Sequence, residues 1–293
     1  MLNPEDVLLA IAACLVAWSV NHLLLRHKAS MLSVDSPNSR SMHSSPTPRG
    51  GGLGIAVSVF ALGGGWLALT GAGTLALVLL VPTAVIAFVS YVDDRRSLPP
   101  LPRFIVHTAA AIGLCAGAGA LSAVSLPGLE IGLAAGLGTV ITIGILIWFT
   151  NLYNFMDGMD GLAAGMGVIG FASLGLLSGA TGDEAGAALC WVICGASLGF
   201  LGMNFPPARL FMGDVGASML GFLAAALIIR SEVRGGFPVW VGLLVFGPFV
   251  VDATVTLLRR LIARERIWEA HSQHFYQQAA RLGFGHRRVV LIE

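Results

Sequence analysis

Short polar runs interrupt an otherwise apolar chain, and one of them spaces carboxylates and amides regularly. The run NLYNFMDGMDGLAAG contains Asn151, Asn154, Asp157 and Asp160 at intervals of three residues. Side chains three residues apart share one face of a helix, so these groups are predicted to project together from a helix end. Cap and turn formation would explain Asp160 beside Gly161. It does not explain two amides in the apolar flank, where an unsatisfied amide is costly.

Two further runs place carboxylates next to long apolar segments. Asp93 and Asp94 are adjacent in YVDDRRSLPPLPR, and two neighbouring carboxylates in a partly desolvated place require a cation or hydrogen-bond donors. The following arginines could supply these structurally, and a divalent metal could supply them functionally. The run MNFPPARLFMGDVGAS contains Asn204, Phe211 and Asp214. Asp214 could cap a helix or join the other carboxylates, and Phe211 could pack on a helix or stack on a nucleobase.

Two basic runs complete the set of polar segments. NSRSMHSSPTPRGGGLG contains Arg40, His43 and Arg49 before three glycines, a combination of cationic donors and open backbone that suits a phosphate. A positively charged membrane flank with a glycine hinge is the alternative. Near the C-terminus, His271 and His274 are three residues apart. They make a poor zinc site without a further ligand and are better suited to donate to a phosphate, unless the segment is an amphipathic helix on lipid.

The elements that position these runs are predicted to be membrane helices. Hydrophobic residues make up 56% of the chain, charged residues 11%, and the mean hydropathy is +0.81, which is outside the range of soluble domains. A net charge of +1 argues against a nucleic-acid partner. Nine segments are long and apolar enough to span a bilayer: 7–25, 53–70, 74–92, 104–123, 133–150, 162–179, 186–203, 215–229 and 237–258. The predicted fold is therefore an all-α polytopic bundle.

Basic residues orient this bundle. Arg230 and Arg234 are the only two of the 17 Lys and Arg residues that fall in the connections on one side, and positive loops stay in the cytoplasm. This predicts an external N-terminus and a membrane domain over residues 1–258. Its cytoplasmic loops 26–52, 93–103, 151–161 and 204–214 carry the candidate site, and residues 259–293 form a cytoplasmic amphipathic segment with the histidines.

The polar runs, taken together and in this order, resemble those of the polyprenyl-phosphate N-acetylhexosamine-1-phosphate transferase family, also called glycosyltransferase family 4. The similarity extends from HSSPTPRGGG through VDD, NLYNFMDGMDGLA and FMGDVG to HSQHFYQQ. The first and last of these motifs resemble bacterial initiators of O-antigen and related lipopolysaccharide glycans more than they resemble the peptidoglycan pentapeptide enzyme. Members of this family generally continue into a further membrane helix, so the resemblance also implies that this chain lacks a final helix.

The resemblance implies that the chain is a Mg²⁺-dependent enzyme of the bacterial inner membrane with its active site facing the cytoplasm. Mn²⁺ is an alternative metal. The implied reaction transfers a sugar 1-phosphate from a UDP-sugar to undecaprenyl phosphate and releases UMP. Besides these substrates the partner is the lipid bilayer, and a homodimer is left open. Peptidoglycan phospho-N-acetylmuramoyl-pentapeptide transfer is an alternative activity, and a membrane transporter is the alternative from another class, for which only Asp252 is a suitable intramembrane charge.

Residue roles are implied in the same way. Asp214 is the expected metal ligand, with Asp94 and Asn154 as further ligands. Asp93 and Asp94 lie nearest the lipid phosphate, and Asp157 and Asp160 complete the catalytic set. Substrate binding is assigned to Arg40, His43, Arg49, Asn151, Asn154, Asn204, Phe211, His271 and His274.

Overall fold

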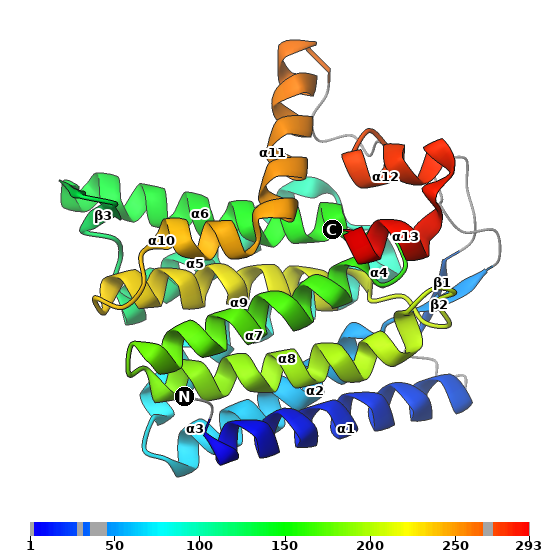
Figure 1. Cartoon of the computed structure of the whole chain (residues 1–293), viewed down its shortest axis with the longest axis horizontal. Coiled ribbons are helices and arrows are strands. Elements are labelled where there is room, and N and C mark those ends of the chain that lie inside the picture. The colour runs from blue at the N-terminus through cyan, green and yellow to red at the C-terminus, as the bar shows by residue number, and fades with distance from the viewer. Residues whose placement is uncertain (1–2, 28–31, 36–45, 266–271, 293) are drawn as a thin grey trace.

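The fold is a bundle of long helices that run side by side (Figure 1). The computed structural model describes residues 3–27, 32–35, 46–265 and 272–292. Within these residues, eight helical segments are long and apolar enough to cross a membrane, and a bent helix pair could make a ninth. The prediction of an all-α polytopic membrane protein is confirmed.

The spanning segments match the first eight predicted from the sequence. They are α1 (Pro4–Arg26), a continuous segment of α2 (Gly52–Ser58), the π-helical turn η1 (Val59–Gly63) and α3 (Gly64–Leu69), then α4 (Gly73–Arg96), α5 (Pro100–Ala118), α6 (Ala135–Met156), α7 (Leu162–Ala180), α8 (Glu184–Asn204) and α9 (Gly213–Val233). Helix α9 lies at the centre, since 89% of its apolar window is buried, against 17% for α1.

The ninth predicted segment is broken. Helix α10 (Val239–Val245) ends before Phe246, and α11 (Gly247–Ile262) continues at an angle of 89° to it. Pro248 is in the first turn of α11, where its missing N–H is tolerated but where it cannot extend a preceding helix. Figure 1 shows α11 leaving the bundle and pointing away from the long helices. The expected domain boundary at residue 258 falls inside this helix.

Helix α11 has two different faces. Val251, Val255 and Leu258 are exposed, whereas Asp252 and Thr256 are buried. This period of three to four residues is that of an amphipathic helix. The exposed apolar side chains suit a lipid environment, and the buried polar side faces the C-terminal elements.

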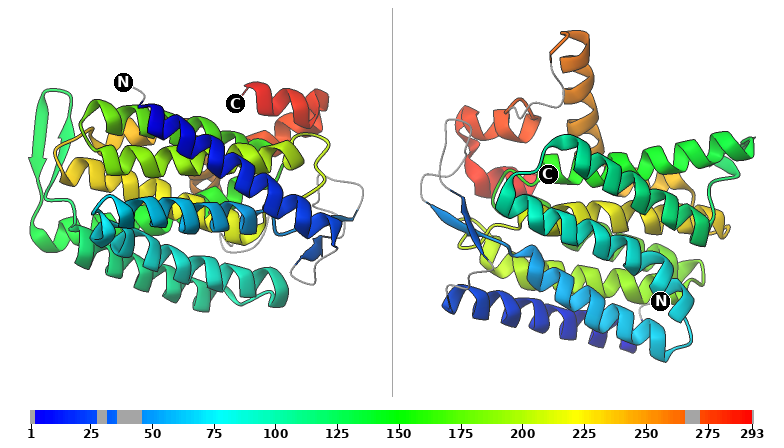
Figure 2. Two further views of the ribbon diagram at one scale, coloured as in Figure 1. Left: turned by 90° about the horizontal axis from the view of Figure 1, so that it is seen from below. Right: turned by 180° about the vertical axis from the view of Figure 1, so that it is seen from behind.

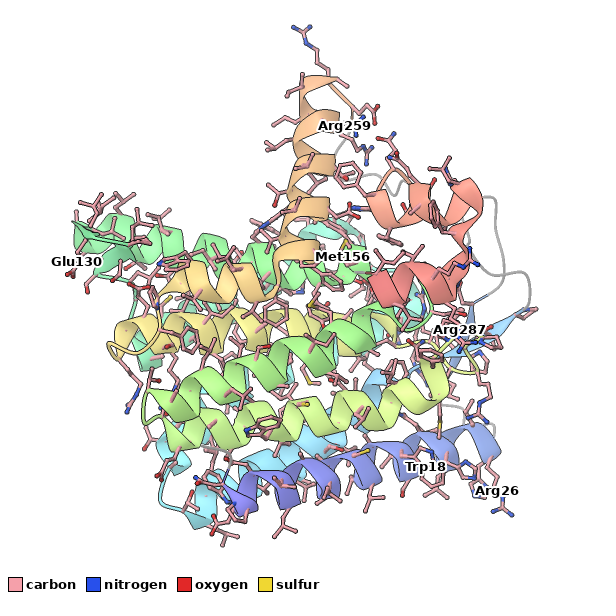
Figure 3. All side chains as sticks on the ribbon, viewed as in Figure 1. Trp18, Arg26, Glu130, Met156, Arg259 and Arg287 are labelled. Carbon is pink, nitrogen blue, oxygen red and sulfur yellow. The ribbon has the colours of Figure 1, made fainter. Side chains whose placement is uncertain are left out.

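Short elements gather at the two ends of the bundle (Figures 1 and 2). At one end lie β1 (Ser33–Asp35) and β2 (Thr47–Arg49), which pair antiparallel, together with α12 (Phe275–Ala279), η2 (Ala280–Phe284) and α13 (Gly285–Ile292). The antiparallel hairpin of β3 (Ala123–Leu126) and β4 (Leu129–Gly132) lies at the opposite end. Arg26 and Arg287 occupy the first end and Glu130 the second (Figure 3), in keeping with the predicted asymmetry of basic residues.

This arrangement predicts that the two ends of the bundle label from opposite sides of the membrane. Ser97 follows α4 and Thr181 follows α7, and both are exposed. In a background with the four native cysteines replaced by alanine, Ser97→Cys is expected to react with a membrane-impermeant maleimide only from the cytoplasm, and Thr181→Cys only from outside. Detergent-permeabilised membranes provide the control in which both react. Reaction of both from the same side of sealed vesicles would disprove the bundle topology.

Candidate active site

Four helix ends and one strand bring charged side chains together at the end of the bundle that carries β1 and β2. Asp93 and Asp94 lie in the last turn of α4, Asp157 follows α6, and Asp214 is in the first turn of α9. The arginines that neutralise these carboxylates come from β2 and from the first turn of α5. Four of the predicted carboxylates therefore come together here, whereas Asp160 binds the backbone of the fourth loop.

Asp94 binds the N-terminus of the central helix. Its carboxylate accepts hydrogen bonds from the backbone N–H groups of Asp214 at 3.1 Å and Val215 at 3.5 Å. The first N–H groups of a helix have no partner within the helix, and a carboxylate there is favoured by the helix dipole. Asp94, from another helix, thus caps α9. The sequence had left open that Asp214 caps this helix, and the structure assigns that contact to Asp94.

The first residue of α9 fits closely against Asp94. Gly213 has a φ of +78°, and a Cβ atom there would lie 2.8 Å from Oδ2 of Asp94. Both the backbone conformation and the close approach therefore require glycine. The N–H of Gly213 also donates to Asp157, so this short turn holds two carboxylates at once.

Asp93 has a different set of partners. Its Oδ2 lies 2.6 Å from Nη1 of Arg103, and its Oδ1 accepts a hydrogen bond from the N–H of Leu98 at 2.6 Å. The same guanidinium lies 3.7 Å from Asp214. Arg103 therefore bridges the acidic turn of α4 and the start of α9, while Asp93 fixes the turn between α4 and α5.

Arg103 is a site residue that sequence reasoning missed. It had been counted only among the basic residues that orient the chain. Its position, ten residues after Asp93 and at the start of the next helix behind a proline-rich turn, was the available signal. Pro100 starts α5 and places Arg103 in its first turn, so the short turn returns the guanidinium to the carboxylate.

Arg49 neutralises the other side of the cluster. Its guanidinium lies 3.5 Å from Asp94 and 3.5 Å from Asp35 of the paired strand β1. Asp214 and Asp157 also interact with it electrostatically. The sequence predicted Arg49 as a donor to a phosphate; in the structure its guanidinium lies at the acidic cluster and is paired with carboxylates.

The backbone amides of the three glycines after Arg49 were predicted to be open to an anion, but they are hydrogen-bonded within the protein. The N–H groups of Gly50 and Gly51 donate to the carbonyl of Phe211 at 3.0 and 2.9 Å, and that of Gly52 donates to Met212 at 2.9 Å. These amides join the first loop to the fourth and are not open to an anion. The backbone of Phe211 is also bridged to Arg49, so Phe211 positions the guanidinium through its main chain, with its side chain half-buried.

Asp157 lies outside the spanning segments, and its acidity is altered by its surroundings. Burial raises the pKa of its carboxyl well above the usual range, and the nearby Asp214 and Asp94 act in the same direction, while Arg49 opposes them. A cation bound beside this carboxyl would lower its pKa again.

Two polar residues of the third and fourth runs bind the backbone of a neighbouring loop. Asn204 is buried, and its amide accepts from the N–H of Gly161 at 2.8 Å and donates to the carbonyl of Leu210 at 3.0 Å. Asp160 accepts from the N–H of Ala208 at 3.0 Å. Both residues join the third loop to the fourth, which is a positioning task.

The amides of α6 differ from each other. Asn151 donates to the carbonyl of Ile147 at 2.7 Å, so its amide is satisfied within its own helix. Asn154 is half-buried, and its side chain makes no hydrogen bond to any residue that the structure describes. Asn154 is therefore the better candidate for contact with a substrate or metal.

The remaining predicted residues lie apart or are not described. Arg40, His43 and His271 fall outside the described residues. His274 is buried at the start of α12, where its ring lies beside that of Phe155, with centroids 6.3 Å apart. Phe155 belongs to the third run, so the histidine segment contacts the end of α6 that carries Asp157.

The donor set fits Mg²⁺ in part. Carboxylate and amide oxygens from Asp214, Asp94 and Asn154 are the hard ligands that Mg²⁺ prefers. No group of three acidic, histidine or cysteine side chains in the described part of the chain is placed to hold a metal alone. A Mg²⁺ site at phosphates commonly takes only one or two carboxylates from the protein and completes its coordination with the substrate and water.

Comparison with known proteins identifies the family of the chain. The profile of glycosyl transferase family 4 matches residues 76–232. The chain belongs to glycosyl transferase family 4. The matched region contains the four carboxylates of the cluster and Arg103, whereas Arg49 and the histidine segment lie outside it.

Individual relatives cover most of the chain. The chain is 31% identical to decaprenyl-phosphate N-acetylglucosaminephosphotransferase of Mycobacterium tuberculosis, over 98% of this chain and 79% of that protein. It is 28% identical to a probable undecaprenyl-phosphate N-acetylglucosaminyl 1-phosphate transferase of Bacillus subtilis, over 96% and 79%. A phospho-N-acetylmuramoyl-pentapeptide-transferase of Shouchella clausii is 30% identical over 84% and 79%.

The bridge made by Arg103 gives a testable prediction for this family 4 protein. Arg103→Ala leaves the buried Asp93 carboxylate without its charged partner, and a charge-assisted hydrogen bond contributes about 1.5–3 kcal/mol. Activity is expected to fall about 10- to 150-fold, with partial recovery in Arg103→Lys. Arg96→Ala, at an exposed position near the same turn, is the control. Wild-type turnover in Arg103→Ala would show that the bridge is dispensable.

Proposed function

We propose that this protein transfers an N-acetylhexosamine 1-phosphate from a UDP-sugar to undecaprenyl phosphate, releasing UMP, at the cytoplasmic face of a bacterial inner membrane. The names of its relatives support a polyprenyl-phosphate acceptor and an N-acetylated sugar. The observation that carries the proposal is the cluster of four carboxylates and two arginines at the end of a membrane bundle. Such a site handles phosphates by positioning them and balancing their charge.

The proposed reaction is a direct displacement. An oxygen of the lipid phosphate forms a bond to the phosphorus that bears the sugar. The bond from that phosphorus to the bridging oxygen breaks, and UMP leaves with that oxygen. A phosphomonoester has a second pKa of about 6, so the acceptor is already ionised at neutral pH and needs no strong base.

The contacts of the two adjacent carboxylates support direct attack over a covalent aspartyl intermediate. Both oxygens of Asp93 are held, by Arg103 and by the N–H of Leu98. Both oxygens of Asp94 accept N–H groups from the start of α9. A carboxylate that must leave such partners to attack phosphorus is a poor nucleophile, whereas these same contacts allow both residues to position the arginines and α9.

The remaining residues act on the donor and on a metal. Asp214 is the proposed first ligand of Mg²⁺, or of Mn²⁺, with Asp94 and Asn154 beside it. The ion would supply charge neutralisation at the donor diphosphate. Arg49 and His274 are proposed donors to the diphosphate, and the half-buried Phe211 and Asn154 are proposed to contact the nucleotide.

The structure removes the main support for a transporter. Asp252 was the only suitable intramembrane charge, and its carboxylate lies 2.9 Å from His274 and binds the start of α12. It is thus tied to the end of the bundle that carries the acidic cluster. Pentapeptide transfer, the activity named for the Shouchella clausii relative, is the same class of reaction and differs only in the donor.

One assay tests the proposed function. Purified protein in detergent or vesicles is incubated with Mg²⁺, undecaprenyl phosphate and each of a panel of UDP-sugars that includes UDP-N-acetylglucosamine and UDP-N-acetylmuramoyl-pentapeptide. UMP release that requires the lipid phosphate is expected with an N-acetylhexosamine donor. Release with the pentapeptide donor alone would assign the alternative activity, and no release with any donor would refute the proposal.

Asp214→Asn separates metal binding from folding. The substitution keeps the size of the side chain, and capping of α9 is preserved because Asp94 accepts its first N–H groups. Turnover is expected to fall at least about 10-fold, and the Mg²⁺ concentration for half-maximal activity is expected to rise, because one anionic ligand is lost. Chelation by EDTA should abolish wild-type activity.

Glu130→Gln is the matched control for Asp214→Asn, since it removes one negative charge from the exposed hairpin at the opposite end of the bundle. It should leave turnover unchanged. Full activity of Asp214→Asn at low Mg²⁺ would place the metal on another residue.

A further inference from the structure

Asp252 has a more complete set of hydrogen bonds than an isolated acid inside an apolar segment would suggest. Its Oδ1 lies 2.9 Å from Nδ1 of His274 and accepts from the Thr256 hydroxyl at 3.1 Å. It also accepts from the N–H of Phe275 at 3.0 Å, and Oδ2 accepts from the N–H of Tyr276 at 3.1 Å. The carboxylate is therefore both a partner of the imidazole and the anchor of the helix start beside it.

The pair is withdrawn from water. The side chains of Asp252 and His274 are each 4% exposed. A charge-assisted hydrogen bond in such a place is stronger than one at the surface, and neither ring rotation nor solvent competes easily with it. The orientation of the imidazole is therefore set by the carboxylate.

The other surfaces of the imidazole are also fixed. The ring stacks against Tyr276, with centroids 5.7 Å apart and an interplanar angle of 18°, and against Phe155 at 6.3 Å and 28°. The Tyr276 hydroxyl donates to the carbonyl of Phe155 at 3.2 Å, and a Cβ atom on Gly158 would lie 2.0 Å from that hydroxyl. The aromatic stack thus connects the histidine to the loop that carries Asp157.

We infer that Asp252 is a positioning residue for the transferase reaction: it fixes the orientation of the His274 ring through Nδ1–H and thereby, through the stacking of that ring on Phe155, the loop that carries Asp157. The link to the reaction rests on the proposed function, whereas the pairing of Asp252 with His274 does not. An ionised carboxylate can only accept, so the ring nitrogen that faces it must carry a proton. The arrangement is that of a buried acid that fixes the tautomer of a histidine.

A kinetic double-mutant cycle distinguishes this role from simple capping of α12. Asp252→Asn is expected to lower kcat/KM for the UDP-sugar about 10- to 150-fold, the loss expected for one charge-assisted hydrogen bond. The KM for undecaprenyl phosphate should not change. In a His274→Ala background the same substitution should change kcat/KM by less than about twofold, because its effect passes through the missing ring. Asp252→Glu, which keeps the charge, should recover part of the activity.

The matched control is a second ion pair, which is partly buried. Asp183 and Arg230 are 2.8 Å apart, with side chains 13% and 14% exposed, at the opposite end of the bundle. Asp183→Asn should lower thermal stability, and its effect on kcat/KM should be the same in wild-type and His274→Ala backgrounds. Equal losses from Asp252→Asn in the two backgrounds would overturn the inference and leave Asp252 as a cap of α12.

A measurement without turnover keeps the pairing testable if the proposed function fails. In protein labelled with ¹⁵N-histidine, the signal that disappears in His274→Ala should show a protonated Nδ1, and Asp252→Asn should shift it. An unprotonated Nδ1 in the wild type would overturn the inference. Absence of UMP release from every donor, with a protonated Nδ1 present, would refute the proposed function and retain the pairing.

Discussion

The site depends on a balance of charge at the ends of α4, α6 and α9. Four carboxylates meet there, and two arginines offset only part of their mutual repulsion. The C-terminus of α4 carries a partial negative charge of its own, which disfavours Asp93 and Asp94 further. The N–H groups at the start of α9 correct this for Asp94. The central helix and the acidic turn therefore stabilise each other, and the residual negative charge of the cluster is what favours a cation.

Much of this could be predicted from the sequence because two of the signals are strong. Apolar segments of spanning length located eight of the helices, and the Asp pair, the third polar run and Asp214 located the carboxylates that converge. The predicted shared helix face was wrong for Asp157 and Asp160, because α6 ends at Met156 and both residues lie beyond it. The break between α10 and α11 was missed, since composition is apolar on both sides of Gly247 and hydropathy does not report the direction of a chain. Pro248 was the local signal for it.

Partnerships between distant side chains could not be predicted. Asn204 and Asp160 have residue types typical of substrate contact, yet both bind backbone N–H or carbonyl groups of neighbouring loops. Nothing in their spacing separates these two tasks, since a buried amide requires partners in either case. The same limit applies to Arg103, whose neighbours in sequence do not include Asp214, and to Asp252, whose histidine lies 22 residues further on.

The backbone hydrogen bonds between the first loop and the fourth determine when the site can assemble during synthesis. The amides of Gly50, Gly51 and Gly52 bind carbonyls some 160 residues later in the chain, and the histidine segment follows after α11. During synthesis from the N-terminus, α1 to α8 are made before the partners of these glycines exist. The charged centre therefore assembles late, because its hydrogen bonds join residues that lie far apart in the sequence. A nascent chain that stalls before α9 therefore lacks an assembled centre, although most of its helices are already inserted.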